Sequence, residues 1–203
     1  DIECESENGF PDPDKAAEEL ICITVKDHTS KRIIVFGMNN FVNDRDDVQY
    51  IKCKSEIDLV HMFTRFWLDY KPNIITGWNV KFFDIPYLMN RFKYLMGEEY
   101  LNQFSPWGVV TGSSAISLGY ARTQNYYDIL GVDVLDYLDL YRKHTFIRRE
   151  SYKLDYIGEV ELGENKTENP YDTFKEFYSN DYQRFIEYNI QDVESVSYTH
   201  LTL

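Results

Sequence analysis

The sequence is poor in the residues that build disulfide scaffolds and zinc sites. Only three cysteines occur, Cys4, Cys22 and Cys53, and no two of them form a Cys-x-x-Cys pair. The four histidines are scattered along the chain without the spacing of metal ligands. This pattern argues against a disulfide-stabilised secreted protein and against a structural zinc site, and it favours an intracellular, reducing compartment.

Long apolar runs and an excess of basic residues are also missing. No run reaches the ~18 residues of a membrane span, and no signal peptide is visible, so we expect no membrane partner. The net charge is −13, which argues against a generic basic nucleic-acid binder. It leaves open an enzyme that binds DNA locally through divalent metals, since a cluster of acids that holds cations is itself negative.

What the sequence has is enough apolar material for one domain with a real core. The chain has 203 residues, is 43% hydrophobic and contains seventeen tyrosines and thirteen phenylalanines, which excludes a disordered protein. Aromatic residues fill cores, but they also stack on nucleic-acid bases. Because the sequence starts at Asp1 without a methionine, inside an apparent strand, we expect it to be a fragment.

Hydrophobic periodicity predicts an α/β fold with a mixed sheet. Two β-branched runs at 20–27 and 31–38 predict a hairpin, and 73–76 reads as a short, fully buried strand. The remaining predicted elements are helices at 56–70, 84–96, 137–144, 151–158 and from 171 onward, a strand at 131–136 and a long β-hairpin within 104–130. We expect Asp84 to stand at the start of its helix, with Pro86 in the first turn.

Four carboxylates stand out by context. Asp1 and Glu3 lie two apart on a strand and so share a face. Asp84 is the one acid in an apolar stretch, and Asp192 lies four residues after Tyr188, on the same face of a helix. If the fold brings these acids together, divalent cations must offset their charge, and oxygen ligands suit Mg²⁺ or Mn²⁺. Two such ions about 3.5–4 Å apart can promote hydrolysis of a phosphodiester.

Each feature alone has a plainer interpretation. Asp1 and Glu3 can be solvated acids at a sheet edge, Asp84 can be an ordinary N-cap, and Tyr188 with Asp192 can be a surface pair. Their joint occurrence in this order is what indicates a site.

The motifs around these acids resemble a known family. "DIE" at 1–3, "GWNVKFFDIPYL" at 77–88 and "YNIQDVES" at 188–195 resemble the three exonuclease motifs of family B DNA polymerases, most closely those of T4-like bacteriophages. Shorter stretches with the same resemblance are "FPDP" at 10–13, "FSPWG" at 104–108 and "LDYLDLYRK" at 135–143. The resemblance implies a 3′→5′ exonuclease domain over 1–196, with a ribonuclease H-like fold, cut from a larger polymerase at both ends. Residues 197–203 read poorly as a helix and would be a tail foreign to the family.

The resemblance also implies roles for individual residues. Asp1, Glu3, Asp84 and Asp192 would hold two Mg²⁺ or Mn²⁺ ions, and Tyr188 would orient the attacking water. Phe10 would stack on the terminal bases, and the less favoured alternative is an ordinary core side chain beside a loop. Asn79 and Phe83 would lie near the substrate strand. The hairpin at 108–130 would help to separate primer from template, although from the sequence alone it is equally a plain extension of the sheet. The expected site therefore consists of eight residues: Asp1, Glu3, Phe10, Asn79, Phe83, Asp84, Tyr188 and Asp192.

The implied partners are the single-stranded 3′ end of primer–template DNA, the remaining polymerase domains and, through the missing part, a sliding clamp. The implied location is the cytoplasm of the host cell, if a phage encodes the protein. No "DTD" or "SLYP" motif occurs, so this stretch should not synthesise DNA by itself. Two alternatives stay open: a non-catalytic module that binds DNA or supports the polymerase, and a stand-alone nuclease of ribonuclease H-like fold.

Overall fold

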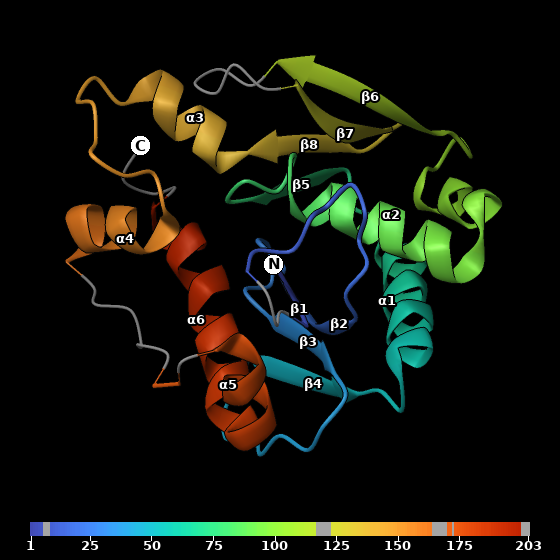
Figure 1. Ribbon diagram of the computed structural model, residues 1–203, viewed down its shortest axis with the longest axis horizontal. Coiled ribbons are helices and arrows are strands. Elements are labelled where there is room, and N and C mark those ends of the chain that lie inside the picture. The colour runs from blue at the N-terminus through green and yellow to red at the C-terminus, as the bar shows by residue number, and fades with distance from the viewer. Residues whose placement is uncertain (6–8, 117–122, 164–169, 172, 200–203) are drawn as a thin grey trace.

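A computed structural model describes residues 1–5, 9–116, 123–163, 170–171 and 173–199 (Figure 1). Strands and helices alternate after an opening run of strands, as predicted. The strands are β1 (Ile2–Cys4), β2 (Leu20–Lys26), β3 (Ile33–Gly37), β4 (Val48–Lys52), β5 (Ile74–Gly77), β6 (Val110–Ile116), β7 (Thr123–Ile129) and β8 (Asp133–Asp136). The helices are α1 (Glu56–Tyr70), α2 (Asp84–Met96), the 3₁₀ helix η1 (Glu98–Phe104), α3 (Tyr137–His144), α4 (Leu154–Leu162), α5 (Phe174–Asn180) and α6 (Tyr182–Thr199).

The central sheet is mixed, in the order β1-β2-β3-β4. β2 pairs antiparallel with β1 and β3, which confirms the hairpin expected from 20–27 and 31–38, and β4 adds parallel to β3. β5 and β8 form a separate parallel pair, and β6 and β7 form the predicted antiparallel hairpin. The positions 117–122 between β6 and β7 lie outside the described residues. The predicted α/β class with a mixed sheet is therefore confirmed.

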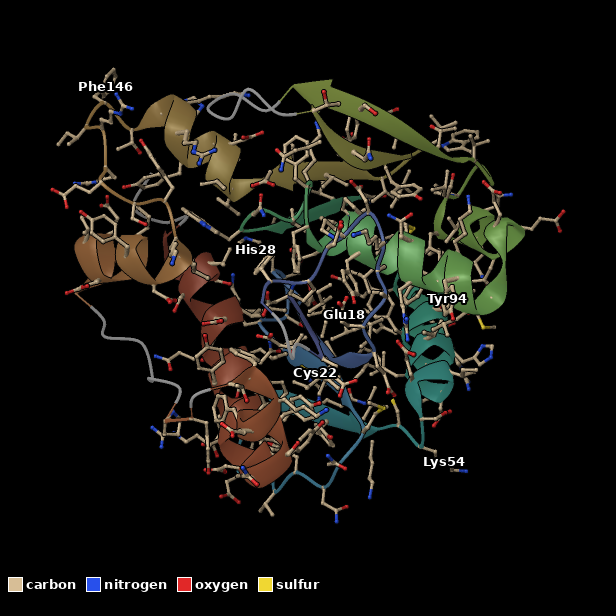
Figure 2. All side chains as sticks on the ribbon, viewed as in Figure 1. Glu18, Cys22, His28, Lys54, Tyr94 and Phe146 are labelled. Atoms are coloured by element: carbon tan, nitrogen blue, oxygen red, sulfur yellow. The ribbon has the colours of Figure 1, made fainter. Side chains whose placement is uncertain are left out.

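Helices cover both faces of the central sheet. Alternate residues of β3 point to opposite sides: Ile34 and Phe36 join the core under α1 and α2, whereas Ile33 and Val35 join the core under α5 and α6. A strand buried on both faces needs apolar residues at every position, which explains the unbroken "IIVF" run. Cys22 lies in this interior, while Phe146 projects from the loop after α3 (Figure 2).

Several predicted elements differ in detail. β5 is not fully buried, and Ile74 is 57% exposed, because among the described strands β5 pairs with β8 alone. The helix expected at 151–158 runs from Leu154 to Leu162, with Lys153 at its N-cap. The stretch from 171 onward divides at Asp181 into α5 and α6. Helix α6 continues to Thr199, so the expectation that 197–199 is not helical is wrong; residues 200–203 lie outside the described part.

Three helices match their predicted bounds. α1, α2 and α3 begin and end where the sequence places them, and Asp84 is the first residue of α2. In Figure 1, the start of α2 and one end of α6 lie on either side of β1, near the N-terminus. This arrangement places three sequence-distant motifs around one region.

Candidate functional site

β1 directs two carboxylates to one side. Ile2 and Cys4 are 4% and 5% exposed and point into the core, so Asp1 and Glu3 point the other way. Two backbone hydrogen bonds fix the strand's start: Thr24 N–H donates to the Asp1 carbonyl at 2.9 Å, and the Asp1 α-amino group donates to the Thr24 carbonyl at 2.9 Å. The buried neighbouring strand β2 thereby holds Asp1 in place.

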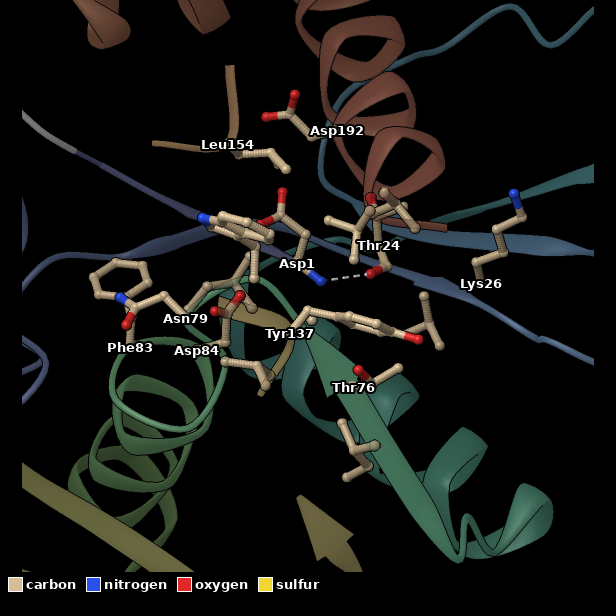
Figure 3. A pocket seen from close by; sticks show the side chains of 18 of the residues that line it. Asp1, Thr24, Lys26, Thr76, Asn79, Phe83, Asp84, Tyr137, Leu154 and Asp192 are labelled. Atoms are coloured by element: carbon tan, nitrogen blue, oxygen red, sulfur yellow. Dashed lines mark hydrogen bonds between the residues drawn. The ribbon is translucent and has the colours of Figure 1, made fainter. Parts of the chain in front are cut away.

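Helix α6 brings the third acid to this pair. Single carboxylate oxygens of Asp1, Glu3 and Asp192 all lie within 4.8 Å of one another. Figure 3 shows Asp1 and Asp192 facing the same pocket from different elements. Three oxygens of this kind at this spacing match what a hard divalent cation binds, and without a cation their charges repel.

Asn189 supports the cluster and was missed by the sequence analysis. It is fully buried on α6, and its Nδ2 donates to Asp1 Oδ2 at 2.7 Å and to Glu3 Oε1 at 3.4 Å. The buried Thr24 hydroxyl donates to its Oδ1. One amide therefore orients two of the three clustered acids. The only sequence signal was its place between Tyr188 and Asp192.

Asp84 lines the same pocket but is not one of the three clustered acids. It is 6% exposed, and its carboxylate points toward Asp1 in Figure 3. The N-cap of α2 is Phe83, so the interpretation of Asp84 as an N-cap is wrong. Burial raises the pKa of Asp84, while the Asp1 α-amino group and the backbone N–H groups of Asp84 and Ile2 act in the opposite direction. A nearby cation would favour its ionised form.

Tyr188 lies on α6, one turn before Asp192, and both line the pocket. Its side chain is 9% exposed, and its ring packs edge-on against Phe174 and Phe177 at centroid distances of 6.0 and 5.8 Å. These contacts fix the ring beside the clustered acids. They make Tyr188 both a core residue and a residue of the pocket wall.

Two phenylalanines, the exposed Phe10 and the half-buried Phe83, form a pair at the pocket. Phe10 is 80% exposed, so the interpretation of Phe10 as a core side chain is wrong. Its ring centroid lies 4.6 Å from that of Phe83, at an interplanar angle of 42°. Both residues line the same pocket as the acids. Aromatic rings at the edge of a pocket provide surfaces on which bases can stack.

Asn79 lies in the loop before α2, in a left-handed conformation with φ of 62°. The Asp136 carboxylate holds this loop: it accepts hydrogen bonds from the backbone N–H groups of Asn79 at 3.1 Å, Lys81 at 3.0 Å and Leu138 at 2.9 Å. Asp136 is 5% exposed, and burial raises its pKa. Asp136 was not among the predicted site residues, because in the sequence it is the ordinary last residue of a strand.

The eight predicted site residues line one cleft, and their individual roles stay predictions. The cleft has a volume of about 2130 Å³, and its lining includes Asp1, Glu3, Phe10, Asn79, Phe83, Asp84, Tyr188 and Asp192. These residues come from four separate parts of the chain, and their convergence indicates a site.

Comparison with known families identifies the family of this chain. Residues 1–157 match the model of the family B DNA polymerase exonuclease domain. The chain belongs to this family. Its exonuclease-domain fold explains why the three motifs, far apart in the sequence, surround one cleft.

Named relatives agree with this family. The chain is 35% identical to the DNA-directed DNA polymerase of Enterobacteria phage T4, over 92% of this chain and 23% of that protein. It is 34% identical to the DNA-directed DNA polymerase of Escherichia phage RB69, over 97% of this chain and 24% of that protein. The DNA polymerase catalytic subunit of Alcelaphine herpesvirus 1 is 28% identical over 84% of this chain. The chain thus spans about a quarter of the length of the phage relatives.

Within the described residues, no helix has the length and apolar character that crossing a membrane requires.

Proposed function

We propose that this exonuclease domain removes nucleotides from the 3′ end of single-stranded DNA and so proofreads for a larger DNA polymerase. The proposal includes a ribonuclease H-like fold for the domain, 1–196 as its extent and two Mg²⁺ or Mn²⁺ ions as its cofactors. Family membership supports the reaction class. The convergence of Asp1, Glu3 and Asp192 within 4.8 Å is the observation that carries it.

The donor set fits divalent ions. Three carboxylates meet at the cluster and a fourth, Asp84, points toward Asp1 from the buried start of α2. Carboxylate oxygens are the ligands that Mg²⁺ and Mn²⁺ prefer. Asp1, Glu3, Asp84 and Asp192 would hold the ions, which supply charge stabilisation to the phosphodiester and a nucleophile derived from water.

The chain's own residues do the rest of the work. Asn189 fixes the orientation of Asp1 and Glu3. Tyr188, held between Phe174 and Phe177, would orient the attacking water. Phe10 and Phe83 would stack on the terminal bases, and Asn79 would border the strand. Stacking is worth ~1–3 kcal/mol per base and does not depend on sequence, as removal of any mispaired base requires.

Selection of errors follows from the need for a single strand. Fraying a paired end costs stacking energy, on average about 1.4 kcal/mol for each step. A mismatched end has already lost part of this energy, so it reaches the cleft more often. The site therefore needs no contact that reads the mismatch itself.

The experiment is digestion of a 5′-labelled single-stranded oligonucleotide by the purified chain in Mg²⁺. Asp192→Asn keeps the shape of the side chain but removes a ligand charge, and we expect at least a hundredfold loss of activity, on the order of what loss of a catalytic geometry costs. Asp69→Asn is the control, since Asp69 is 77% exposed on α1. Equal digestion by wild type and Asp192→Asn would refute the proposal.

The remaining partners are also proposals. We infer that the other polymerase domains flank this chain in a longer protein and deliver primer–template DNA to the cleft. A sliding clamp would act through a part of that protein outside this chain. The phage relatives support the host-cell cytoplasm as the place of action.

A further inference from the structure

The β6–β7 hairpin is connected to the Phe10 loop by a chain of two side-chain hydrogen bonds. Tyr127 on β7 donates its hydroxyl to Asn90 Oδ1 on α2 at 2.6 Å. The Nδ2 of the same Asn90 donates to the Pro13 carbonyl at 2.8 Å. Asn90 thus uses both ends of its amide, one toward the hairpin and one toward the loop.

The loop between Phe10 and Pro13 is stiff. Pro11 and Pro13 have restricted φ angles. The Asp12 side chain accepts the Asp14 N–H at 3.0 Å, and the Asp12 carbonyl accepts the Ala16 N–H at 2.8 Å. These restraints leave few free backbone torsions between the Pro13 carbonyl and Phe10.

A second contact of β7 reaches the same loop. Asn125 Nδ2 donates to Asp14 Oδ1 at 3.0 Å, so β7 contacts the loop directly through Asn125 and indirectly, by way of Asn90, through Tyr127 on the same face of the strand. Both contacts lie on the Pro13–Asp14 side of the turn. The loop is thus fixed between β7 and α2.

The residue between these two contacts reaches the other half of the aromatic pair. Tyr126 packs edge-on against Phe82, with ring centroids 6.2 Å apart. The Lys81 Nζ lies 4.5 Å from the centre of the Tyr126 ring. Phe82 immediately precedes Phe83 in the chain. β7 therefore contacts both the loop that carries Phe10 and the residue next to Phe83.

We propose that Tyr127 and Asn90 are positioning residues for DNA binding: through them the β6–β7 hairpin sets the place of Phe10 against Phe83. The position of the hairpin then determines how firmly the terminal bases are held. This inference rests on the proposed function, since it assumes that the Phe10–Phe83 pair stacks on bases.

Two conservative variants test the connection. Tyr127→Phe removes only the hydroxyl, and Asn90→Asp keeps the acceptor for Tyr127 but loses the donor to Pro13. Tyr94→Phe is the matched control, because Tyr94 lies on the same helix, is 75% exposed and points outward (Figure 2). The probe is a short oligo(dT) with 2-aminopurine at its 3′ end, bound in EDTA so that it is not cleaved.

We expect Tyr127→Phe and Asn90→Asp each to weaken oligonucleotide binding about two- to fivefold and to lower the stacking signal of 2-aminopurine. Phe10→Ala should weaken it more, about five- to a hundredfold, in line with the loss of one base stack. Tyr94→Phe should bind as wild type does. Because the hydroxyl acts through Phe10, adding Tyr127→Phe to Phe10→Ala should cause no further loss.

A merely structural role would lower the melting temperature and leave affinity and 2-aminopurine signal unchanged, and this result would overturn the inference. Equal fold-losses by Tyr127→Phe in the wild-type and Phe10→Ala backgrounds would also overturn it. If Phe10→Ala weakens binding and Tyr127→Phe does not, the positioning role fails and the proposed function stands. If wild type and Phe10→Ala bind the oligonucleotide equally, the stacking role in the proposed function fails, and the inference fails with it.

Discussion

Asn189 Nδ2 donates to Asp1 Oδ2 at 2.7 Å across a sequence separation of 188 residues. This hydrogen bond joins the middle of α6 to the start of β1. The same Nδ2 group also donates to Glu3 Oε1. The Thr24 hydroxyl donates to Oδ1 of Asn189. The acid cluster is therefore built on a buried polar network and not on three independent surface carboxylates.

Removal of this network should be costly. Asn189→Ala leaves the buried Thr24 hydroxyl and one oxygen of Asp1 without their partner. We expect the free energy of unfolding to fall by about 1–3 kcal/mol, measured by urea denaturation. Digestion of single-stranded DNA should fall as well, since Asp1 and Glu3 lose their orientation.

Asn102→Ala provides the comparison, because Asn102 is exposed on η1. Surface substitutions of this kind usually change stability by less than about 0.5 kcal/mol. If Asn189→Ala is as stable and as active as Asn102→Ala, the network has no supporting role.

A buried ion pair holds the C-terminal end of the loop that carries Phe10, at Ala16 and Ala17. Arg91 on α2 and Glu56 on α1 meet at 2.7 Å, with both side chains 8% exposed. Arg91 also donates to the carbonyls of Ala16 and Ala17, and Glu56 accepts the Leu20 N–H. Glu56→Ala should lower the free energy of unfolding by about 3–5 kcal/mol, because it leaves a buried cation unpaired.

The exposed pair of Arg65 and Asp69 is the matched control, with side chains 79% and 77% exposed. Exposed pairs contribute about 0–1 kcal/mol, so Asp69→Ala should unfold at nearly the wild-type urea concentration. If Asp69→Ala and Glu56→Ala lower the free energy of unfolding by similar amounts, burial of the Glu56–Arg91 pair does not contribute to stability.

Asp136 should matter for activity through the loop before α2. Asp136→Asn places an amide donor where the carboxylate accepts the Lys81 N–H. We expect the loop to shift and, with it, the start of α2 at Asp84, so that digestion of single-stranded DNA falls about 10- to 100-fold. Steady-state digestion of the labelled oligonucleotide measures this.

Asp133→Asn, an exposed position on the same strand β8, should digest at the wild-type rate. Wild-type activity in Asp136→Asn would show that the three backbone hydrogen bonds of Asp136 do not position the site.

Thiol labelling reports ion binding without any cleavage. All three cysteines are buried, and burial raises the pKa of Cys53 to about 11, so few thiolates exist at neutral pH in the folded chain. Cys4 follows Glu3 on β1, and its labelling requires β1 to open. Mg²⁺ at about a hundred times its Kd should slow Cys4 labelling about a hundredfold, because it binds only the folded site. A labelling rate independent of Mg²⁺ would contradict ion binding next to β1.

Local patterns predicted much of this fold. α1, α2 and α3 have clear periodicity and matched their predicted bounds, and the β2–β3 hairpin followed from two β-branched runs. The placement of β5 was harder: "NIIT" is apolar in sequence, but its partner is a single strand and not the central sheet. Periodicity reports which residues are apolar and not how many neighbours cover them.

The sequence predicted only some of the residues at the site, because it does not show which distant residues come into contact. The order of three motifs predicted Asp1, Glu3, Asp84 and Asp192 as site residues, and of these only Asp84 is unusual in its local surroundings, as an acid in an apolar stretch. Asn189 and Asp136 are ordinary in theirs: an asparagine inside a helix and an aspartate at the end of a strand are common in sequence. Their roles come from partners 188 and 57 positions away, which only the folded chain brings into contact.

The most direct test of the account is anomalous diffraction from a crystal of this chain grown with Mn²⁺. We predict an anomalous peak within about 2.0–2.4 Å of carboxylate oxygens from Asp1, Glu3 and Asp192, as expected for a hard divalent ion. The absence of a peak there, in a crystal that shows these three side chains ordered and Mn²⁺ bound elsewhere, would contradict the central claim.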